Sequence, residues 1–230
     1  SENQLASYLA RVNYSFKDRY LLTISGRYDG SSVLAAGNKW AFFPSAALGW
    51  RLDQEDFMKD IEWIDQLKAR FGVGVTGNSA VDAYGTLGVI SAYWMPFSTG
   101  NTQIFVTNEP YYTSGSNKMP NKEFGWEKTT QFNYGIDFSF LENWDVTLEY
   151  FIKNTKDLLL TQQIRPTAGF TSIYTNYGEI QNKGFEFTVN YHKQVNKDFG
   201  FNVSLNGSTL SNKVKKMGDP IYSTCSANGA

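Results

Sequence analysis

The sequence is poor in the residues that build disulfides, metal sites and proton-transfer chemistry. Its 230 residues include one cysteine and one histidine. Cys225 has no partner in the chain, which excludes an internal disulfide framework and a cysteine-based metal site. A metal cluster or a Ser-His-Asp triad built on His192 alone would need nearly every other part to be unusual. We therefore interpret His192 as an ordinary strand-end residue, and we expect no metal, no cofactor and no enzymatic activity.

An excess of one charge and long apolar runs are also missing. The sequence has 21 Lys and Arg against 22 Asp and Glu, and no basic cluster stands out, which argues against a nucleic-acid partner. No run of about 18 apolar residues is present, so no transmembrane helix is predicted. The N-terminus also lacks the charged and apolar regions of a signal peptide. Strands that cross a bilayer need no such run, because their lipid-facing and lumen-facing residues alternate.

What the sequence does contain is a repeated period of two. From Ala6 to Phe16 the even positions are apolar and most odd positions are polar, which predicts a strand with one apolar face. The alternation resumes after Lys17-Asp18-Arg19, which predicts a tight hairpin. The predicted strands are Ala6–Phe16, Tyr20–Asp29, Trp40–Asp53, Leu67–Asn78, Thr129–Phe140, Trp144–Lys153, Phe185–His192 and Phe199–Ser208.

The lengths of these segments and of their connections favour strands that cross a membrane. Most segments run about 10 residues, which is what a tilted strand needs to span a bilayer. The connections alternate between short (17–19, 141–143, 193–198) and long (30–39, 79–128, 154–184). Bacterial outer-membrane barrels have this asymmetry, with short periplasmic turns and long outer loops. One connection on the short side, Gln54–Gln66, is longer, and its apolar spacing suggests a short amphipathic helix.

The two faces of these segments differ in charge. Over the predicted segments the apolar face has no Asp, Glu, Lys or Arg, whereas the opposite face has charges of both signs. Charges are costly on a lipid face, and a mixed polar lining suits a water-filled lumen. The predicted lumen-lining residues are Arg11, Arg27, Arg51, Arg70, Asp137, Glu149 and Glu186. A soluble β-sandwich with its apolar face inward also alternates, and it stays an alternative.

Aromatic residues and one proline mark the strand ends. The aromatics near these ends resemble the interfacial girdle of membrane barrels. They are Tyr14, Phe16, Tyr20, Phe138, Phe140, Trp144, Tyr191 and Phe199. Pro44 interrupts the third strand and has no N–H for the ladder. We therefore place Pro44 near the outer rim of that strand, at a bulge.

Six separated blocks of the sequence resemble one family in the same order. The blocks are NYSFKDRYLLTISGRYDGSS, WAFFPSAALGWRL, EDFMK, LKARFGVGVTGN, WEKTTQFNYGIDFSFL and NYGEIQNKGFEFT. They are similar to the C-terminal half of the barrel in SusC/RagA-type TonB-dependent outer-membrane transporters of Bacteroidetes. The resemblance covers essentially the whole chain, although the sequences after DGSS and before WEK differ from those usual in the family.

The resemblance implies an antiparallel up-and-down transmembrane barrel of about 22 strands with an N-terminal plug, of which this chain supplies about eight strands. Members import oligosaccharides, glycans or peptides with energy from the TonB complex, and a SusD-type surface lipoprotein commonly forms a lid. Signal peptide, TonB box, plug and terminal strand are absent from this sequence. We therefore expect residues 1–230 to be a partial barrel domain in the outer membrane. It would contact outer-membrane lipid and the lid directly, and TonB through the missing N-terminal part.

The long connection 79–128 is rich in aromatic residues. Exposed aromatic rings can stack on sugar rings, because they offer rigid apolar faces with a polar handle on Tyr and Trp. The candidates for substrate or lid contact are Tyr93, Trp94, Phe97, Tyr111 and Tyr112. Packing within the loop is the third interpretation, and all three apply to Asp157–Thr175 as well.

Gly72 to Gly77 match the G-x-G-x-x-G pattern of dinucleotide sites. That motif works only where a strand ends in the glycines and a helix N-terminus follows. Here the apolar alternation continues through Val73 and Val75, and no helical pattern follows. We interpret the segment as a strand whose lumen-facing glycines leave room for the plug or a loop.

Three hypotheses follow for the function. The first is a barrel segment of a TonB-dependent nutrient transporter, with glycan or peptide cargo left open. The second is a soluble all-β module such as a carbohydrate-binding or adhesin-like domain, and the third is a siderophore or vitamin receptor. Because eight strands would leave two unpaired edges, we expect the isolated chain not to behave as a stable monomer.

Overall fold

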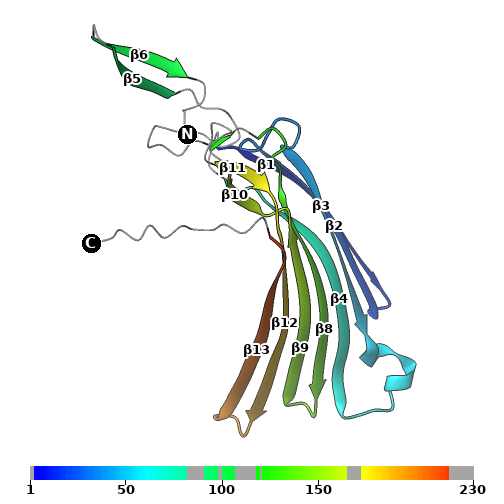
Figure 1. The fold of residues 1–230 in the computed structure, drawn as a ribbon. Helices are drawn as coiled ribbons and strands as arrows, with labels where there is room; N and C mark the ends of the chain where they lie inside the picture. Colours follow the sequence, from blue (N-terminus) through cyan, green and yellow to red (C-terminus); the bar gives the residue numbers. More distant parts are fainter. Residues whose placement is uncertain are drawn as a thin grey trace, which may run out of the picture.

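One eight-stranded antiparallel sheet dominates the fold (Figure 1). The computed structural model describes residues 3–81, 91–97, 100–106, 118–119, 121–164 and 172–217. In spatial order, the strands are β1 (Leu5–Phe16), β2 (Tyr20–Ser31), β3 (Trp40–Arg51), β4 (Ile64–Asn78), β8 (Glu127–Phe140), β9 (Trp144–Lys156), β12 (Glu179–Gln194) and β13 (Gly200–Lys216). The sheet is open, with β1 and β13 as its two edges.

The remaining elements are short and belong to the connections. A three-stranded sheet contains β10 (Leu159–Gln163), β11 (Ser172–Asn176) and β7 (Lys118–Met119), and a two-stranded sheet contains β5 (Ser91–Phe97) and β6 (Gly100–Val106). Two 3-10 helices, η1 (Leu52–Gln54) and η2 (Asp56–Met58), follow β3. We call the end of the large sheet that has the connections 32–39, 79–126 and 157–178 the long-loop end, and the opposite end the short-turn end.

The all-β antiparallel prediction is confirmed, and each of the eight predicted segments is a strand of the large sheet. Among the residues that the structure describes, no helix is long and apolar enough to cross a bilayer. Several predicted strand ends are wrong, and the largest differences are in β12 and β13. β12 begins at Glu179 rather than Phe185, and β13 continues to Lys216 rather than Ser208. These extensions contain four Lys and two Asn, residues with a weak strand preference that backbone pairing with a neighbouring strand holds in the sheet.

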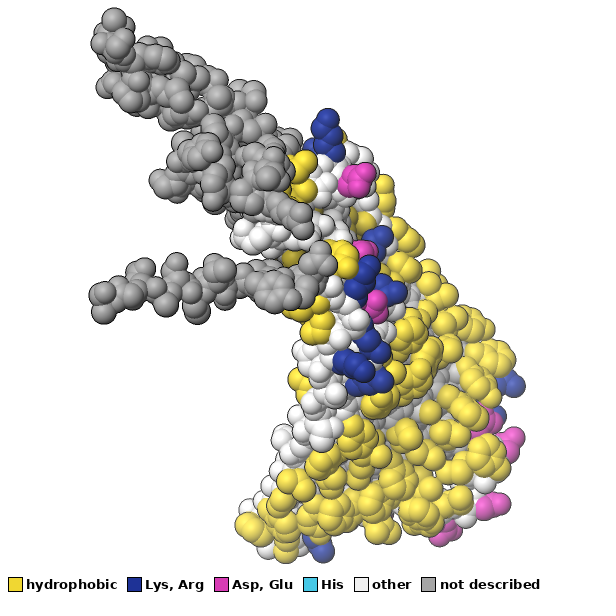
Figure 2. All heavy atoms as spheres, viewed as in Figure 1, with side chains coloured by type: hydrophobic (Ala, Val, Ile, Leu, Met, Phe, Trp, Pro, Cys, Tyr) yellow, Lys and Arg dark blue, Asp and Glu magenta, His cyan; other side chains and the backbone are white. Residues whose placement is uncertain are grey.

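The pairing register separates the side chains into two faces. Residues directly opposite each other in antiparallel strands point to the same side of the sheet. One such row crosses all eight strands and is apolar at seven of its positions: Tyr14, Leu22, Leu48, Phe71, Tyr134, Tyr150, Phe185 and Thr209. Figure 2 shows this face, covered by hydrophobic side chains along most of the length of the strands.

The apolar face is uncovered. Tyr8 is 67% exposed, Leu48 54% and Leu205 61%, although they lie on different strands of the sheet. Within the described ranges, no second layer of helices or strands packs on this face. A soluble sandwich buries its apolar face between two sheets, so this single layer departs from that architecture.

Aromatic rings contact one another along the short-turn end of the apolar face. The contacts run from Trp63 to Phe138, Phe140, Trp144, Tyr191 and Phe201, with centroid separations of 4.7 to 6.1 Å. Tyr20 stacks on Trp50 at the same end. At the long-loop end, Trp40 stacks between Tyr8 and Tyr28. Most of the aromatics predicted near the strand ends therefore form a band at the short-turn end, and Tyr8, Tyr28 and Trp40 form a second group at the long-loop end that was not predicted.

Two short turns use left-handed backbone without glycine. Lys17 and Asp18 have φ of 53° each, and the N–H of Arg19 donates to the carbonyl of Phe16 at 3.1 Å. Leu141 and Glu142 repeat the pattern, with φ of 51° and 58°. Positive φ at both central residues gives a turn the twist of its flanking strands, which is why such turns close two-stranded hairpins.

The bulge expected at Pro44 is wrong. β2 and β3 pair without a register shift, and Pro44 lies opposite Gly26. On the other side of β3, pairing with β4 begins only at Ser45. Pro44 therefore lies just beyond the last paired residue on that side, where a missing N–H removes no ladder bond.

The amphipathic helix expected over Gln54–Gln66 is also wrong. Two three-residue 3-10 helices flank Glu55, whose backbone is extended at φ −78° and ψ 147°, and Ile64 already belongs to β4. The extended backbone brings the Glu55 carboxylate to the girdle: Tyr20 Oη donates to it at 2.8 Å and Trp50 Nε1 at 3.0 Å. Arg19 Nη1 donates at 3.1 Å. These three contacts hold the connection against β2 and β3.

A small buried cluster lies at the long-loop end, on the side of the sheet opposite the apolar face. Its members are Val33, Leu34, Ala35, Phe43, Phe124 and Trp126. The Phe43 ring meets Trp126 edge to face at 5.4 Å and also lies over Gly77, where an added Cβ would clash with the ring. The N–H of Ala35 donates to the carbonyl of Phe124, and Trp126 Nε1 donates to that of Lys39. The cluster thus ties the β2–β3 connection to the segment before β8.

Phe43→Ala is expected to loosen these two segments. Removing a buried phenyl ring costs about 3 kcal/mol, so the amides of Ala35 and Asn38 should exchange hydrogen roughly a hundredfold faster. Phe42→Ala is the matched control, because Phe42 is adjacent, has the same ring and lies exposed on the apolar face. Hydrogen exchange followed by mass spectrometry measures both variants. Equal protection of these amides in the two variants would contradict the role of the cluster.

The Glu55 contacts predict a titration at low pH. The hydrogen bonds that Trp50 and Tyr20 donate, together with the Arg19 charge, lower the pKa of Glu55 below its ordinary value. A lowered pKa means that the contacts are complete above about pH 4.3 and are lost as the pH falls through the pKa of the folded protein. The nitrogen-15 resonance of the Trp50 indole should report this step. Glu55→Gln should abolish this pH-dependent step, and the control Asp60→Asn should leave the step unchanged. A midpoint above the ordinary pKa of glutamate would contradict the proposed effect of the Glu55 contacts.

Candidate functional site

The candidate site lies on the polar face of the large sheet. A row of opposed residues on this side runs through Arg11, Ser25, Ser45, Gly74, Gln131, Lys153, Asn182 and Asn212. Each of the seven predicted lumen-lining residues is an even number of positions from the member of this row on its own strand. The strand period of two therefore places all seven on this same face. That the face lines a lumen stays a prediction.

Three of the seven residues form one ion-pair network. Arg70 of β4 reaches across to Asp137 of β8, with Nε 2.8 Å from Oδ2 and Nη2 donating to Oδ1 at 3.0 Å. The same Nη2 lies 3.7 Å from Oε2 of Glu149 on β9. Glu186 of β12 lies directly opposite Glu149 in the register. One guanidinium thus joins carboxylates of two strands, and a third carboxylate lies beside Glu149 on the next strand.

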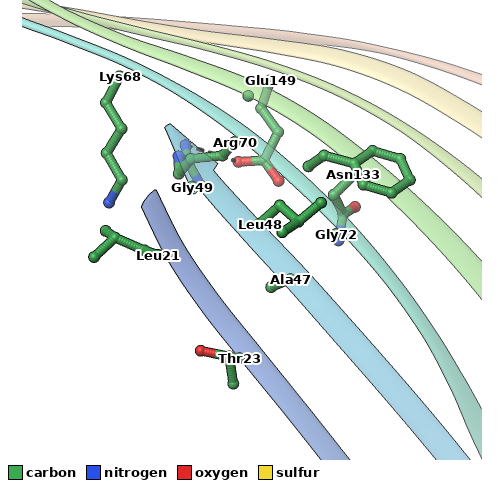
Figure 3. A pocket seen from close by; sticks show the side chains of 12 residues that line it. Leu21, Thr23, Ala47, Leu48, Gly49, Lys68, Arg70, Gly72, Asn133 and Glu149 are labelled. Atoms are coloured by element: carbon green, nitrogen blue, oxygen red, sulfur yellow. Dashed lines mark ion pairs between the residues drawn. The ribbon is translucent and has the colours of Figure 1, made fainter. Parts of the chain in front are cut away.

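A glycine makes room for this network. Gly135 lies opposite Arg70 in the β4–β8 ladder, and a Cβ on it would come within 2.9 Å of the guanidinium. Without that Cβ, the Arg70 side chain lies across β8 toward β9. Figure 3 shows Arg70 and Glu149 pointing toward each other above the strands.

A shallow hollow of about 320 Å³ surrounds the network (Figure 3). Its lining comes from β2, β3, β4, β8 and β9 and includes Leu21, Thr23, Gly49, Lys68, Gly72 and Asn133. The glycines at 49, 72 and 135 lower the floor of the hollow. A Cβ added to Gly72 would be in ordinary van der Waals contact with the Asn133 side chain, at 3.9 Å. The room expected there for another segment stays a prediction.

The other predicted lumen residues stand apart from this network. Arg27 pairs with Asp29, Nε to Oδ2 at 2.7 Å, and Arg51 pairs with Asp53, Nη2 to Oδ2 at 2.8 Å. Asp29 is buried near the long-loop end, whereas Asp53 is in η1 at the short-turn end. Burial raises the pKa of Asp53, but hydrogen bonds from Gln54 and Arg51 outweigh it and leave that pKa lowered. Arg11 is exposed on β1.

The structure also places the glycine-rich motif and the single histidine. Gly72 to Gly77 lie inside the continuous strand β4, so their interpretation as strand residues is confirmed. His192 lies near the end of β12, with Nδ1 3.4 Å from Oδ2 of Asp145. The described part of the chain has no group of three or more His, Cys, Asp or Glu that could hold a metal ion.

The predicted aromatic contact residues are only partly described. Tyr93, Trp94 and Phe97 belong to β5, whose backbone pairs with β6. Tyr111 and Tyr112 lie outside the described residues. Their contact with a substrate or a lid stays a prediction.

Sequence patterns did not reveal the acidic partners of the arginines or the buried cluster at the long-loop end. Asp29 and Asp53 lie two positions after Arg27 and Arg51, so their shared side of the strand was the available signal. Phe124 is fully buried, but it is in an irregular segment without periodicity. The polar face offers charges of both signs, several of them held in ion pairs, which suits contact with water and polar surfaces.

The chain matches a known family over nearly its full length. Residues 1–227 match the family model described as TonB dependent receptor-like, beta-barrel. The chain is 37% identical over 223 residues to the TonB-dependent receptor SusC of Bacteroides thetaiotaomicron, which covers 94% of this chain and 21% of SusC. It is 34% identical over 225 residues to the TonB-dependent receptor P3 of Formosa agariphila, covering 96% and 22%. The chain thus spans about a fifth of the length of these relatives.

Solved structures share the fold. The RagAB peptide importer in its open-open state superposes with a TM-score of 0.83 at 22% identity, over 99% of this chain and 24% of that one. The siderophore receptor PirA from Pseudomonas aeruginosa gives 0.56 at 15% identity, over 93% and 36%. At these identities the likeness concerns the fold alone. The family match and the identity to SusC carry the assignment: this chain belongs to the TonB-dependent receptors and forms part of their β-barrel domain.

Proposed function

We propose that this chain is part of the barrel wall of an outer-membrane transporter that imports an oligosaccharide, glycan or peptide with energy from TonB. The uncovered apolar face of the eight-stranded sheet carries the proposal. Its large side chains are about half exposed or more on several strands, while charged side chains fill the opposite face. In a bilayer the apolar face would contact lipid, and closure of the barrel would satisfy the two sheet edges.

The polar face would then line the lumen. Five of the seven predicted lumen residues, Arg27, Arg51, Arg70, Asp137 and Glu149, are paired with opposite charges. This pairing lowers the cost of placing them in a confined, partly dry space. The hollow around Arg70 offers a place where a plug or an inward loop could pack against the wall. Members of this family are transporters rather than enzymes.

The partners follow from membership in the SusC/RagA type, which the identity to SusC supports. A SusD-like surface lipoprotein would cover the long-loop end, and TonB would act through a segment outside this chain. The aromatic residues of the connection 79–128 would contact the substrate or this lid. Siderophore or vitamin uptake is the weaker alternative, because the relatives above 30% identity include SusC.

A cell experiment tests the function. The gene that encodes the receptor is deleted, and growth is compared on panels of oligosaccharides and of peptides as sole nutrients. We expect the protein in the outer-membrane fraction and loss of growth on one of the two classes. A TonB-deficient strain should show the same defect, since uptake would need its energy. Recovery of the protein in a soluble fraction, or normal growth on both panels, would overturn the proposal.

The Arg70 network predicts a stability difference between two lumen arginines. Arg70→Gln leaves Asp137 and Glu149 near Glu186 without their shared cation, and we expect a loss of about 1 kcal/mol. Arg11→Gln removes the same charge from an exposed site and should cost less than about 0.5 kcal/mol. Thermal unfolding of the receptor in micelles compares the two variants. A larger shift for Arg11→Gln would contradict the structural role of the network.

A further inference from the structure

Lysines gather at the long-loop end of the apolar face. The extended strand ends place Lys128 of β8 directly opposite Lys156 of β9, and Lys156 opposite Glu179 of β12. Lys183 of β12 lies opposite Ile152, which puts it on the apolar side. Lys213 of β13 lies opposite Gln181, two positions before Lys183 and therefore on that side as well. We call Lys128, Lys156, Lys183 and Lys213 the lysine patch.

The patch has a surplus of positive charge. All four side chains are exposed, and among the described residues none of them forms an ion pair. Three acidic groups lie nearby, fewer than the four lysines: Glu179 within the row, and Asp157 and Glu123, which line a hollow with Lys128. Lys216 borders the patch opposite Glu179, with Nζ 4.6 Å from the centre of the Tyr177 ring. Figure 2 shows Lys and Arg side chains grouped at the border of the hydrophobic face.

The position of the patch indicates the kind of partner. The patch continues the face that contacts lipid in the proposed function, and this inference rests on that proposal. Lysine stems can lie along apolar surface while their amines reach the interface, where anionic headgroups attract them. Lysines serving a lumen would instead lie on the opposite side of the strands. The partner that fits is therefore a lipid with a negatively charged headgroup.

The width of the patch limits which lipid headgroups could contact all four lysines. Lys128 and Lys213 lie on strands separated by two intervening strands, which corresponds to about 15 Å at ordinary strand spacing. A single phosphate is too small to contact amines across that width, and all four patch lysines are exposed rather than arranged as buried donors around one ion. We propose that the lysine patch binds a lipid headgroup that carries more than one phosphate, in the leaflet at the long-loop end.

Lipid binding to the complete receptor in a neutral detergent tests this proposal. The probe is lipid A, a glucosamine disaccharide lipid with two phosphates, and native mass spectrometry measures its Kd. Replacing the four patch lysines, Lys128→Gln, Lys156→Gln, Lys183→Gln and Lys213→Gln, should weaken binding at least tenfold, since each lysine near an anionic surface contributes to the attraction. Lipid A without its phosphates should bind both proteins equally.

A matched variant separates the patch from overall charge. Lys17→Gln, Lys59→Gln, Lys193→Gln and Lys197→Gln make the same change in net charge at the short-turn end, and binding should stay at the unaltered value. An equal loss in both variants, or no loss in the patch variant, would overturn the proposal. Displacement of lipid A by millimolar inorganic phosphate would overturn the assignment to a lipid source.

A membrane assay distinguishes this proposal from the proposed function. All three proteins are mixed with phosphatidylcholine vesicles and floated on a density gradient. If all three proteins float and all three still bind lipid A more tightly than lipid A without phosphates, only the lysine-patch proposal is refuted. Failure of the unaltered receptor to float would refute its placement in a membrane.

Discussion

The continuous hydrogen-bond ladder across eight strands is the constraint on which the rest of this structure depends. The ladder runs from β1 to β13 with register shifts only next to Ile64 at the start of β4 and next to Glu179 at the start of β12. Between these shifts, the parity of a residue number on its strand decides which of the two faces the side chain joins. A one-residue slip in any strand would move its aromatics into the charged face and its charges into the apolar one. The cost of such a slip is high in a bilayer, and the pairing is therefore strongly specified.

The ends of the strands are secured by different means at the two ends of the sheet. At the short-turn end, left-handed turns at Lys17 and Leu141 close hairpins, and Glu55 holds the longer connection to two girdle aromatics. At the long-loop end, the connections are too long for such turns, and packing of Phe43, Phe124 and Trp126 takes their place. The only substantial buried cluster in the described residues thus lies where the chain is least constrained by local geometry.

Sequence periodicity predicted the two faces well because a strand has a fixed period of two. It located Arg70, Asp137, Glu149 and Glu186 on one side, but it could not show that Arg70 crosses Gly135 to join two of these carboxylates. The ends of the strands were harder to predict, because the segments around Lys183 and Lys213 have a composition typical of loops. Only pairing with neighbouring strands holds these segments in the sheet. The helix expected near Phe57 failed for a similar reason, since side-chain contacts of Glu55 fix its backbone in an extended form.

The distribution of charge along the apolar face is consistent with a defined membrane thickness. β9 has 13 residues, from the girdle residue Trp144 to Lys156, which is about 40 Å of strand. A tilt of about 40° reduces this to about 30 Å along the bilayer normal, slightly more than the apolar band of outer-membrane barrels at about 25 Å. The aromatic row at one end and the lysine row at the other then both fall in interfacial zones. In the proposed membrane placement, lysines would be tolerated on the apolar face at this height because their amines need not enter the hydrocarbon. Lysines four positions nearer to Trp144 would have to place their amines inside it.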